Sequence, residues 1–174
     1  SSTSQDGFVQ QAVQMARVLR DQLFLNGYKA FKDPLSNSWA TVAEGCALTA
    51  GIIGGLGGVR CRTAAAHPIH NGLTQLDYKN KPLHGELVGF GLLVQLHLEE
   101  KNSNSQLPKQ AKSQLIDFLS QLDLPISIDS ICLKNATSNE LYKACKFACK
   151  NDSDIHQLPF TINDKDLLKA IQSY

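Results

Sequence analysis

The sequence has little net charge and few aromatic residues. Its 174 residues include 17 Lys or Arg and 16 Asp or Glu, a formal net charge of +1, and aromatic residues make up 7% of the chain. It contains no cluster of Lys and Arg with interleaved aromatic residues, which is the pattern that binds nucleic acid. The composition therefore excludes a strongly basic surface, and we expect no nucleic-acid partner.

Paired cysteines and long apolar runs are also missing. The five cysteines are odd in number, and none belongs to a Cys-x-x-Cys pair. This usage favours reduced, mostly buried thiols over a disulfide framework. The apolar stretch 45–59 is shorter than the roughly 20 residues that a membrane-spanning helix needs. We therefore expect a cytoplasmic protein without a membrane partner.

The sequence does contain helical periodicity along most of its length. Apolar residues recur at spacings of three and four, and no segment shows the sustained alternation of a strand. The stretch 87–98 is apolar on nearly every side, which is typical of a helix at the centre of a bundle. We predict a single domain over residues 1–174, of the all-α class, a bundle of about seven or eight helices.

Glycines and capping residues indicate where these helices end and where they pack closely. Gly27 stands where the first helix would have its C-terminal cap, and 99–106 resembles a polar loop. Asn163 is suited to cap the last helix. The glycines at 54, 55, 57 and 58 lack the strand and the spacing of a dinucleotide-binding motif, so we interpret them as a helix end that another element approaches. We expect similar close contacts at Gly85, Gly89 and Gly91.

Three of the five histidines lie in one stretch, residues 64–90, AAAHPIHNGLTQLDYKNKPLHGELVGF. His67 and His70 are about one helical turn apart, and His84 follows a connection that contains a proline. Imidazole is the commonest metal ligand, so the pattern indicates two helix starts that bring imidazoles together. Histidines at this spacing are also often structural. Catalytic zinc or iron takes three protein ligands, and His70, Asp77 and Glu86 remain alternatives for the third.

Two motifs here resemble the C-terminal domain of the glycerol dehydrogenases. They are AAHPIHNGLT at 65–74 and HGELVGFG at 84–91, and LPI at 124–126 and DIHQLP at 154–159 follow in the same order. These enzymes belong to the iron-containing (metal-dependent) alcohol dehydrogenase superfamily, together with dehydroquinate synthase. The resemblance implies a helical domain that follows a Rossmann-like nucleotide-binding domain, and we expect that N-terminal domain to be absent from this chain.

The resemblance also implies a metal site. A divalent ion, Zn²⁺ or Fe²⁺, would be held by His67, His84 and an Asp that we expect outside this chain. His70 would line the pocket or relay a proton, while Glu86 and Asn71 would orient the two ligating imidazoles.

The implied function is that of a glycerol- or polyol-like alcohol dehydrogenase that uses NAD or NADP when full length. Without the cofactor domain and one ligand, the chain alone is expected to be inactive and, through its exposed apolar face, to self-associate. Substrate contacts are expected from Arg60, Arg62 and Phe90, and the two arginines would otherwise pair with acids of the absent domain. Two alternatives remain: a dehydroquinate synthase-like lyase, whose paired histidines are spaced four apart, and a non-enzymatic helical interaction module.

Overall fold

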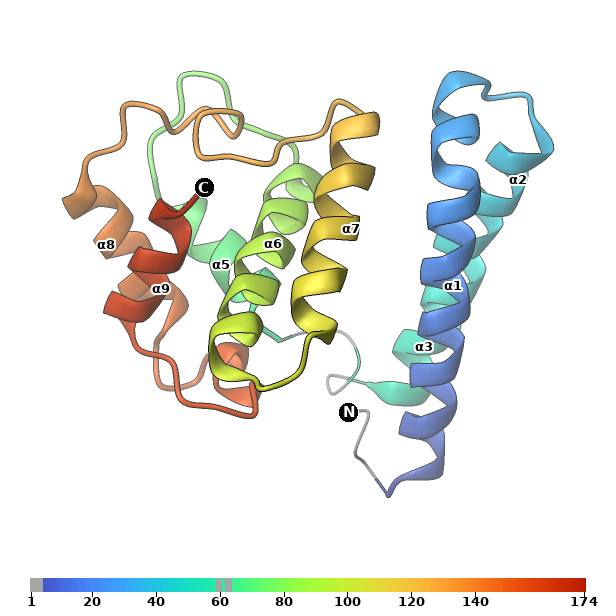
Figure 1. The fold of residues 1–174 in the computed structure, drawn as a ribbon, viewed down its shortest axis with the longest axis horizontal. Coiled ribbons are helices and arrows are strands. Elements are labelled where there is room, and N and C mark those ends of the chain that lie inside the picture. The colour runs from blue at the N-terminus through green and yellow to red at the C-terminus, as the bar shows by residue number, and fades with distance from the viewer. Residues whose placement is uncertain (1–4, 59–60, 62–63) are drawn as a thin grey trace. The chain divides into compact units, whose positions relative to one another are not determined.

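The computed structural model describes residues 5–58, 61 and 64–174 of the chain. All of the regular secondary structure among these residues is helical, which confirms the all-α prediction (Figure 1). We expected a single domain over 1–174, and contacts within the chain divide it into two compact units, Ser1–Thr63 and Ala64–Tyr174.

The first unit is a helical hairpin. Its α1 packs along a second, continuous helix that consists of α2, a π-helical turn and α3. The side chain of Asp6 begins α1 by accepting hydrogen bonds from two backbone N–H groups, and that of Ser36 begins α2 by accepting one. The bounds are α1 Gly7–Lys32, α2 Asn37–Glu44, π-helical turn Gly45–Thr49 and α3 Ala50–Gly57.

Glycines allow the two helices of the hairpin to approach closely. A Cβ built on Gly45 would lie 2.7 Å from a methyl group of Leu19, and one on Gly57 would lie 3.2 Å from the Cβ of Ala12. Gly57 is also the last residue of α3, so the glycine run does mark the end of a helix, as predicted. The predicted helix end at Gly27 is wrong: this residue is buried inside α1, where helix packing outweighs the roughly 1 kcal/mol cost of glycine in a helix.

The second helix of the hairpin is apolar and little buried. It extends from Asn37 to Gly57, 21 residues with a mean hydropathy of 1.3, and 17% of that window is buried. By length and composition it is able to cross a membrane, although core helices of soluble proteins pass the same test. The apolar run 45–59 alone is too short for this, but the helix begins at Asn37, before the run. Exposed large apolar side chains of the hairpin are Phe8, Val18, Leu25, Tyr28, Phe31, Leu35, Trp39, Leu48 and Ile52.

The second unit is a bundle built around α6. In Figure 1, α6 lies between α5 and α7, and it also packs on α9, while α5 and α9 both pack on α8. The large side chains at its centre are buried, which confirms the expected central helix. The bounds are α5 Ala66–Leu73, α6 His84–Asn102, α7 Leu107–Gln121, α8 Ser138–Ala148, a 3₁₀ turn Asp154–Gln157 and α9 Asp164–Gln172.

The ends of the bundle helices agree in part with the sequence signals. The side chain of Asn163 accepts hydrogen bonds from two backbone N–H groups and caps α9, as predicted. The loop predicted at 99–106 is wrong for its first residues, because α6 continues to Asn102. Glu100 in this last turn forms an ion pair with Lys112 of α7, a contact between helices that the local sequence does not reveal.

Candidate metal site

The three clustered histidines meet where α5 and α6 begin. His67 is the second residue of α5, and His84 is the first residue of α6. The ring centroids of His67 and His84 are 5.9 Å apart with the planes at 51°, and those of His70 and His84 are 4.3 Å apart. The structure therefore brings together imidazoles from two helix starts.

The start of α5 is capped by a side chain of α6. Oε1 of Gln95 accepts hydrogen bonds from the backbone N–H groups of Ala65, at 3.0 Å, and Ala66, at 3.1 Å. The Nε2 group of Gln95 donates to Glu99 at 2.8 Å, which fixes the orientation of the amide. Sequence reasoning missed Gln95 because the acceptor lies 29 and 30 residues from its donors.

Two glycines bring α5 against its neighbours. A Cβ on Gly91 of α6 would lie 2.6 Å from the carbonyl oxygen of Ala66, and a Cβ on Gly72 of α5 would lie 2.3 Å from a carbonyl oxygen of α8. The close contact predicted at Gly91 is therefore confirmed. The same prediction is wrong for Gly85, where an added Cβ would meet no neighbouring atom within 4 Å. On Gly89 an added Cβ would make only an ordinary contact, at 3.9 Å.

The three imidazoles differ in exposure. His70 is buried, with 9% of its surface exposed, whereas His67 is half-buried and His84 is exposed. Burial lowers the pKa of His67, the neighbouring His84 and His70 lower it further, and Asp154 acts in the opposite direction. The lowered pKa favours the neutral form of His67 near neutral pH, and this is the form that binds metal ions.

One side-chain hydrogen bond connects His84 to α5, and a second continues from it within α5. Nδ1 of His84 lies 3.0 Å from Nε2 of His70, and Nδ1 of His70 lies 2.9 Å from Oδ1 of Asn71. Both ring nitrogens of His70 are engaged in this way, and Asn71 contacts His70 directly.

The other predicted site residues have different surroundings. The carboxylate of Glu86 accepts a hydrogen bond at 2.7 Å from the backbone N–H of Leu83 and so caps α6. Phe90 is fully buried in the core of the bundle, so its ring has no exposed surface with which to contact a substrate. Arg60 and Arg62 lie outside the described residues.

The separation of the histidine pair is compatible with two ligands of a metal site. A zinc-bound imidazole has its ring centroid about 3.2 Å from the ion, so two such rings lie at most about 6.4 Å apart. The separation of 5.9 Å between the centroids of His67 and His84 is within that limit. Among the described residues, no group of three His, Cys, Asp or Glu side chains is arranged to hold a metal ion. A third protein ligand would therefore have to come from outside the described residues.

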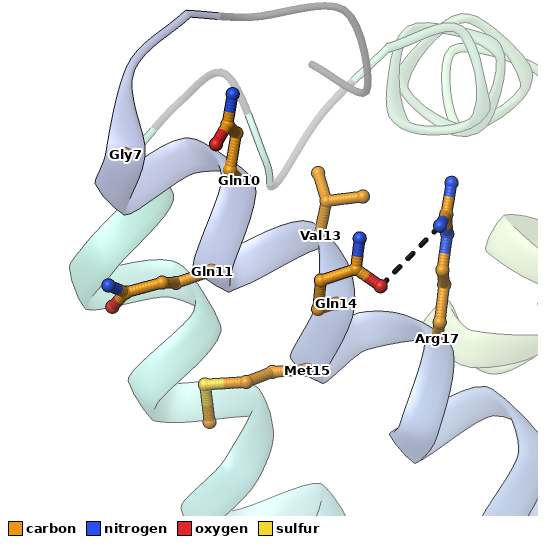
Figure 2. A pocket seen from close by; sticks show the side chains of 7 residues that line it. All are labelled: Gly7, Gln10, Gln11, Val13, Gln14, Met15 and Arg17. Carbon is orange, nitrogen blue, oxygen red and sulfur yellow. Dashed lines mark hydrogen bonds between the residues drawn. The ribbon is translucent and has the colours of Figure 1, made fainter.

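A hollow of about 740 Å³ lies along the first half of α1, away from the histidine stretch in the sequence (Figure 2). At its edge Nη1 of Arg17 donates a hydrogen bond of 3.5 Å to Oε1 of Gln14, drawn as a dashed line in Figure 2. Its described lining includes no His, Cys, Asp or Glu, so it offers no acid, base or metal ligand. The lining residues are Gly7, Gln10, Gln11, Val13, Gln14, Met15 and Arg17.

Proteins of similar sequence include named dehydrogenases. An uncharacterized oxidoreductase of Synechocystis sp. is 46% identical over 173 residues, which cover 99% of this chain and 45% of that protein. A glycerol dehydrogenase of Thermotoga maritima is 30% identical over 162 residues, 93% of this chain and 43% of that protein. The chain is homologous to glycerol dehydrogenase-like oxidoreductases. No protein-family model matches it.

Solved structures agree with the sequence relatives. The crystal structure of glycerol dehydrogenase from Schizosaccharomyces pombe matches with a TM-score of 0.80 and 27% identity, over 94% of this chain and 41% of that one. A probable glycerol dehydrogenase from Sinorhizobium meliloti matches with a TM-score of 0.79 and 27% identity, over 94% and 45%. The resemblance inferred from the histidine motifs is confirmed. The chain spans less than half the length of these relatives.

Proposed function

We propose that this chain is the metal-binding helical part of an NAD- or NADP-dependent dehydrogenase that oxidises glycerol or a related polyol. The convergence of His67 and His84 from two helix starts carries the proposal, in a chain homologous to glycerol dehydrogenases. Imidazole suits both zinc and iron, so either ion is compatible with the pair.

In the proposed site, His67 and His84 hold a divalent ion as neutral imidazoles, and an aspartate outside the described residues is the third ligand. A bound ion would act as a Lewis acid on the alcohol oxygen of the substrate. The lowered pKa of His67 keeps its lone pair available near neutral pH. His84 is exposed, so a small alcohol would be able to reach it. Nicotinamide binding is assigned to a part of the enzyme that this chain does not span.

The chain on its own is expected to bind metal weakly and to show no activity. Two ligands make an incomplete site, and the proposed cofactor-binding part is not included. The exposed apolar side chains of the first unit, including Leu25, Leu35 and Leu48, would meet that part of the enzyme or a second copy of the chain. We therefore expect self-association of the chain at high concentration.

Calorimetric titration of the 174-residue chain with Zn²⁺ tests the metal site. Wild type should bind weakly, and His67→Ala and His84→Ala should bind less or not at all. His156→Ala is a matched control, since His156 is exposed and bonds to the Lys150 carbonyl. Tight, saturating binding by wild type would reveal a third ligand within the chain. Unchanged binding by His67→Ala and His84→Ala would show that neither histidine binds the metal ion.

Activity is tested in the full-length protein that contains this chain. Oxidation of glycerol should require NAD or NADP and a divalent ion, and His84→Ala should abolish it while His156→Ala retains it. Equal rates for the two variants would refute the proposed function.

A further inference from the structure

The hydrogen bonds around His70 determine where the protons of two imidazoles lie. With Oδ1 of Asn71 as the acceptor, the nearby Nδ1 of His70, at 2.9 Å, carries the hydrogen. A neutral imidazole carries one N–H, so the Nε2 of His70 has only a lone pair. The hydrogen in the 3.0 Å contact with His84 therefore belongs to Nδ1 of His84.

The proton on Nδ1 of His84 leaves its Nε2 with a free lone pair. Which ring nitrogen of a histidine binds a metal ion is set by the hydrogen bond that the other nitrogen makes. His84 is exposed and begins α6, so little packing restrains its ring. His70 is buried beside it and is the neighbour able to restrain the ring.

We propose that His70 is a positioning residue that, with Asn71 as its terminal acceptor, fixes the tautomer and ring orientation of His84 so that Nε2 of His84 points its lone pair at the metal ion. This inference rests on the proposed function only in taking His84 as a metal ligand. It assigns His70 a different role from proton relay, because the chain of hydrogen bonds ends at Oδ1 of Asn71, an amide oxygen that does not take up a proton.

The tautomer is measurable without metal. In the ¹⁵N-labelled, metal-free chain, long-range ¹H–¹⁵N spectra distinguish protonated from unprotonated ring nitrogens, at a pH well above the ordinary histidine pKa of about 6.5. We expect His84 to carry its proton on Nδ1 in wild type and to show a mixture of tautomers in His70→Ala. His70→Gln should restore the wild-type signal, because the glutamine oxygen can accept from Nδ1. His156→Ala should leave it unchanged.

The exposed residue Asn71 provides a second pair of variants that does not disturb the core. Asn71→Asp keeps an acceptor for His70 and should preserve the His84 tautomer, whereas Asn71→Leu removes the acceptor and should weaken the preference. If His70→Ala fails to fold, as judged by circular dichroism, the wild-type spectrum and these two variants decide the question. A wild-type His84 protonated on Nε2, or a tautomer unmoved by any of the variants, would overturn the inference.

Metal affinity separates this inference from the proposed function. In the full-length protein, loss of a group that orients a ligand typically weakens metal binding by about 10–100-fold, and we expect this for His70→Ala with partial recovery in His70→Gln. Full affinity in His70→Ala would refute the positioning role while the metal site stands. A wild-type protein that shows the expected tautomer but binds no metal would instead refute the proposed function.

Discussion

Replacing Gly91 by alanine should weaken the contact between the two histidine-bearing helices. A Cβ at this position would lie 2.6 Å from the carbonyl oxygen of Ala66, the residue that precedes His67. Gly89 lies on the same helix, and its nearest neighbour to an added Cβ is a leucine methyl group at 3.9 Å. Gly89→Ala is therefore the matched control.

Two opposing contributions set the change in unfolding free energy of Gly91→Ala. Alanine gains about 0.8–1.0 kcal/mol over glycine inside a helix, whereas overpacking costs about 1–3 kcal/mol. The upper end of the overpacking cost applies to Gly91→Ala, because the added Cβ would contact a backbone oxygen, that of Ala66. This backbone cannot move aside easily, since Gln95 holds the start of α5. We expect a net loss of about 1–2 kcal/mol, which lowers Tm by roughly 2–8 °C. Gly89→Ala should gain up to about 1 kcal/mol.

Urea and thermal unfolding, followed by circular dichroism, measure both variants against wild type. A Gly91→Ala protein as stable as Gly89→Ala would refute the close approach of α6 to the Ala66 carbonyl. In the full-length protein, the same substitution should also weaken metal binding, because it moves His67 away from His84.

Three further substitutions test separate features of the fold. Gln95→Ala removes the cap of α5 and should cost about 1–2 kcal/mol, measured from urea midpoints; a value within error of wild type would remove the capping role. Asp123 has a φ of 55°, so Asp123→Gly should raise the unfolding free energy by up to about 1 kcal/mol, and a loss of stability would contradict this. Burial raises the pKa of Tyr174 to about 12, so the unfolded chain, with a tyrosine pKa near 10, releases that proton first. Stability present below about pH 10 is therefore lost between about pH 10 and 12; Tyr174→Phe should flatten this decline in urea midpoints, and an equally steep decline would refute the reasoning.

The fold class was predictable because helical periodicity is a local property of the sequence. The apolar stretch 87–98 identified the central helix, and Asn163 identified the start of α9. Errors arose where contacts between helices override local signals. Gly27 resembles a helix end but is buried inside α1, and residues 99–102 resemble a loop but continue α6, where Glu100 pairs with Lys112 of the next helix.

The metal site was predictable to a smaller extent. The spacing of His67, His70 and His84 indicated that imidazoles converge, but not which nitrogen contacts which ring. Glu86 was a reasonable candidate to orient a ligand, yet its carboxylate caps α6. The hydrogen bond from His84 to His70 depends on how α5 packs on α6, and that packing depends on Gly91 and on a cap from a residue far along the chain.

The cap that Gln95 provides has a consequence for the order of folding. An isolated helix of eight residues, the length of α5, is not stable in water. The backbone N–H groups of Ala65 and Ala66 find their acceptor on Gln95 only when α6 is already formed and docked. The imidazoles at 67 and 84 should therefore meet in a late step, together with the native packing of the bundle. Metal loading would then favour the completed fold over every earlier intermediate, so that a bound ion protects the protein from local opening of α5.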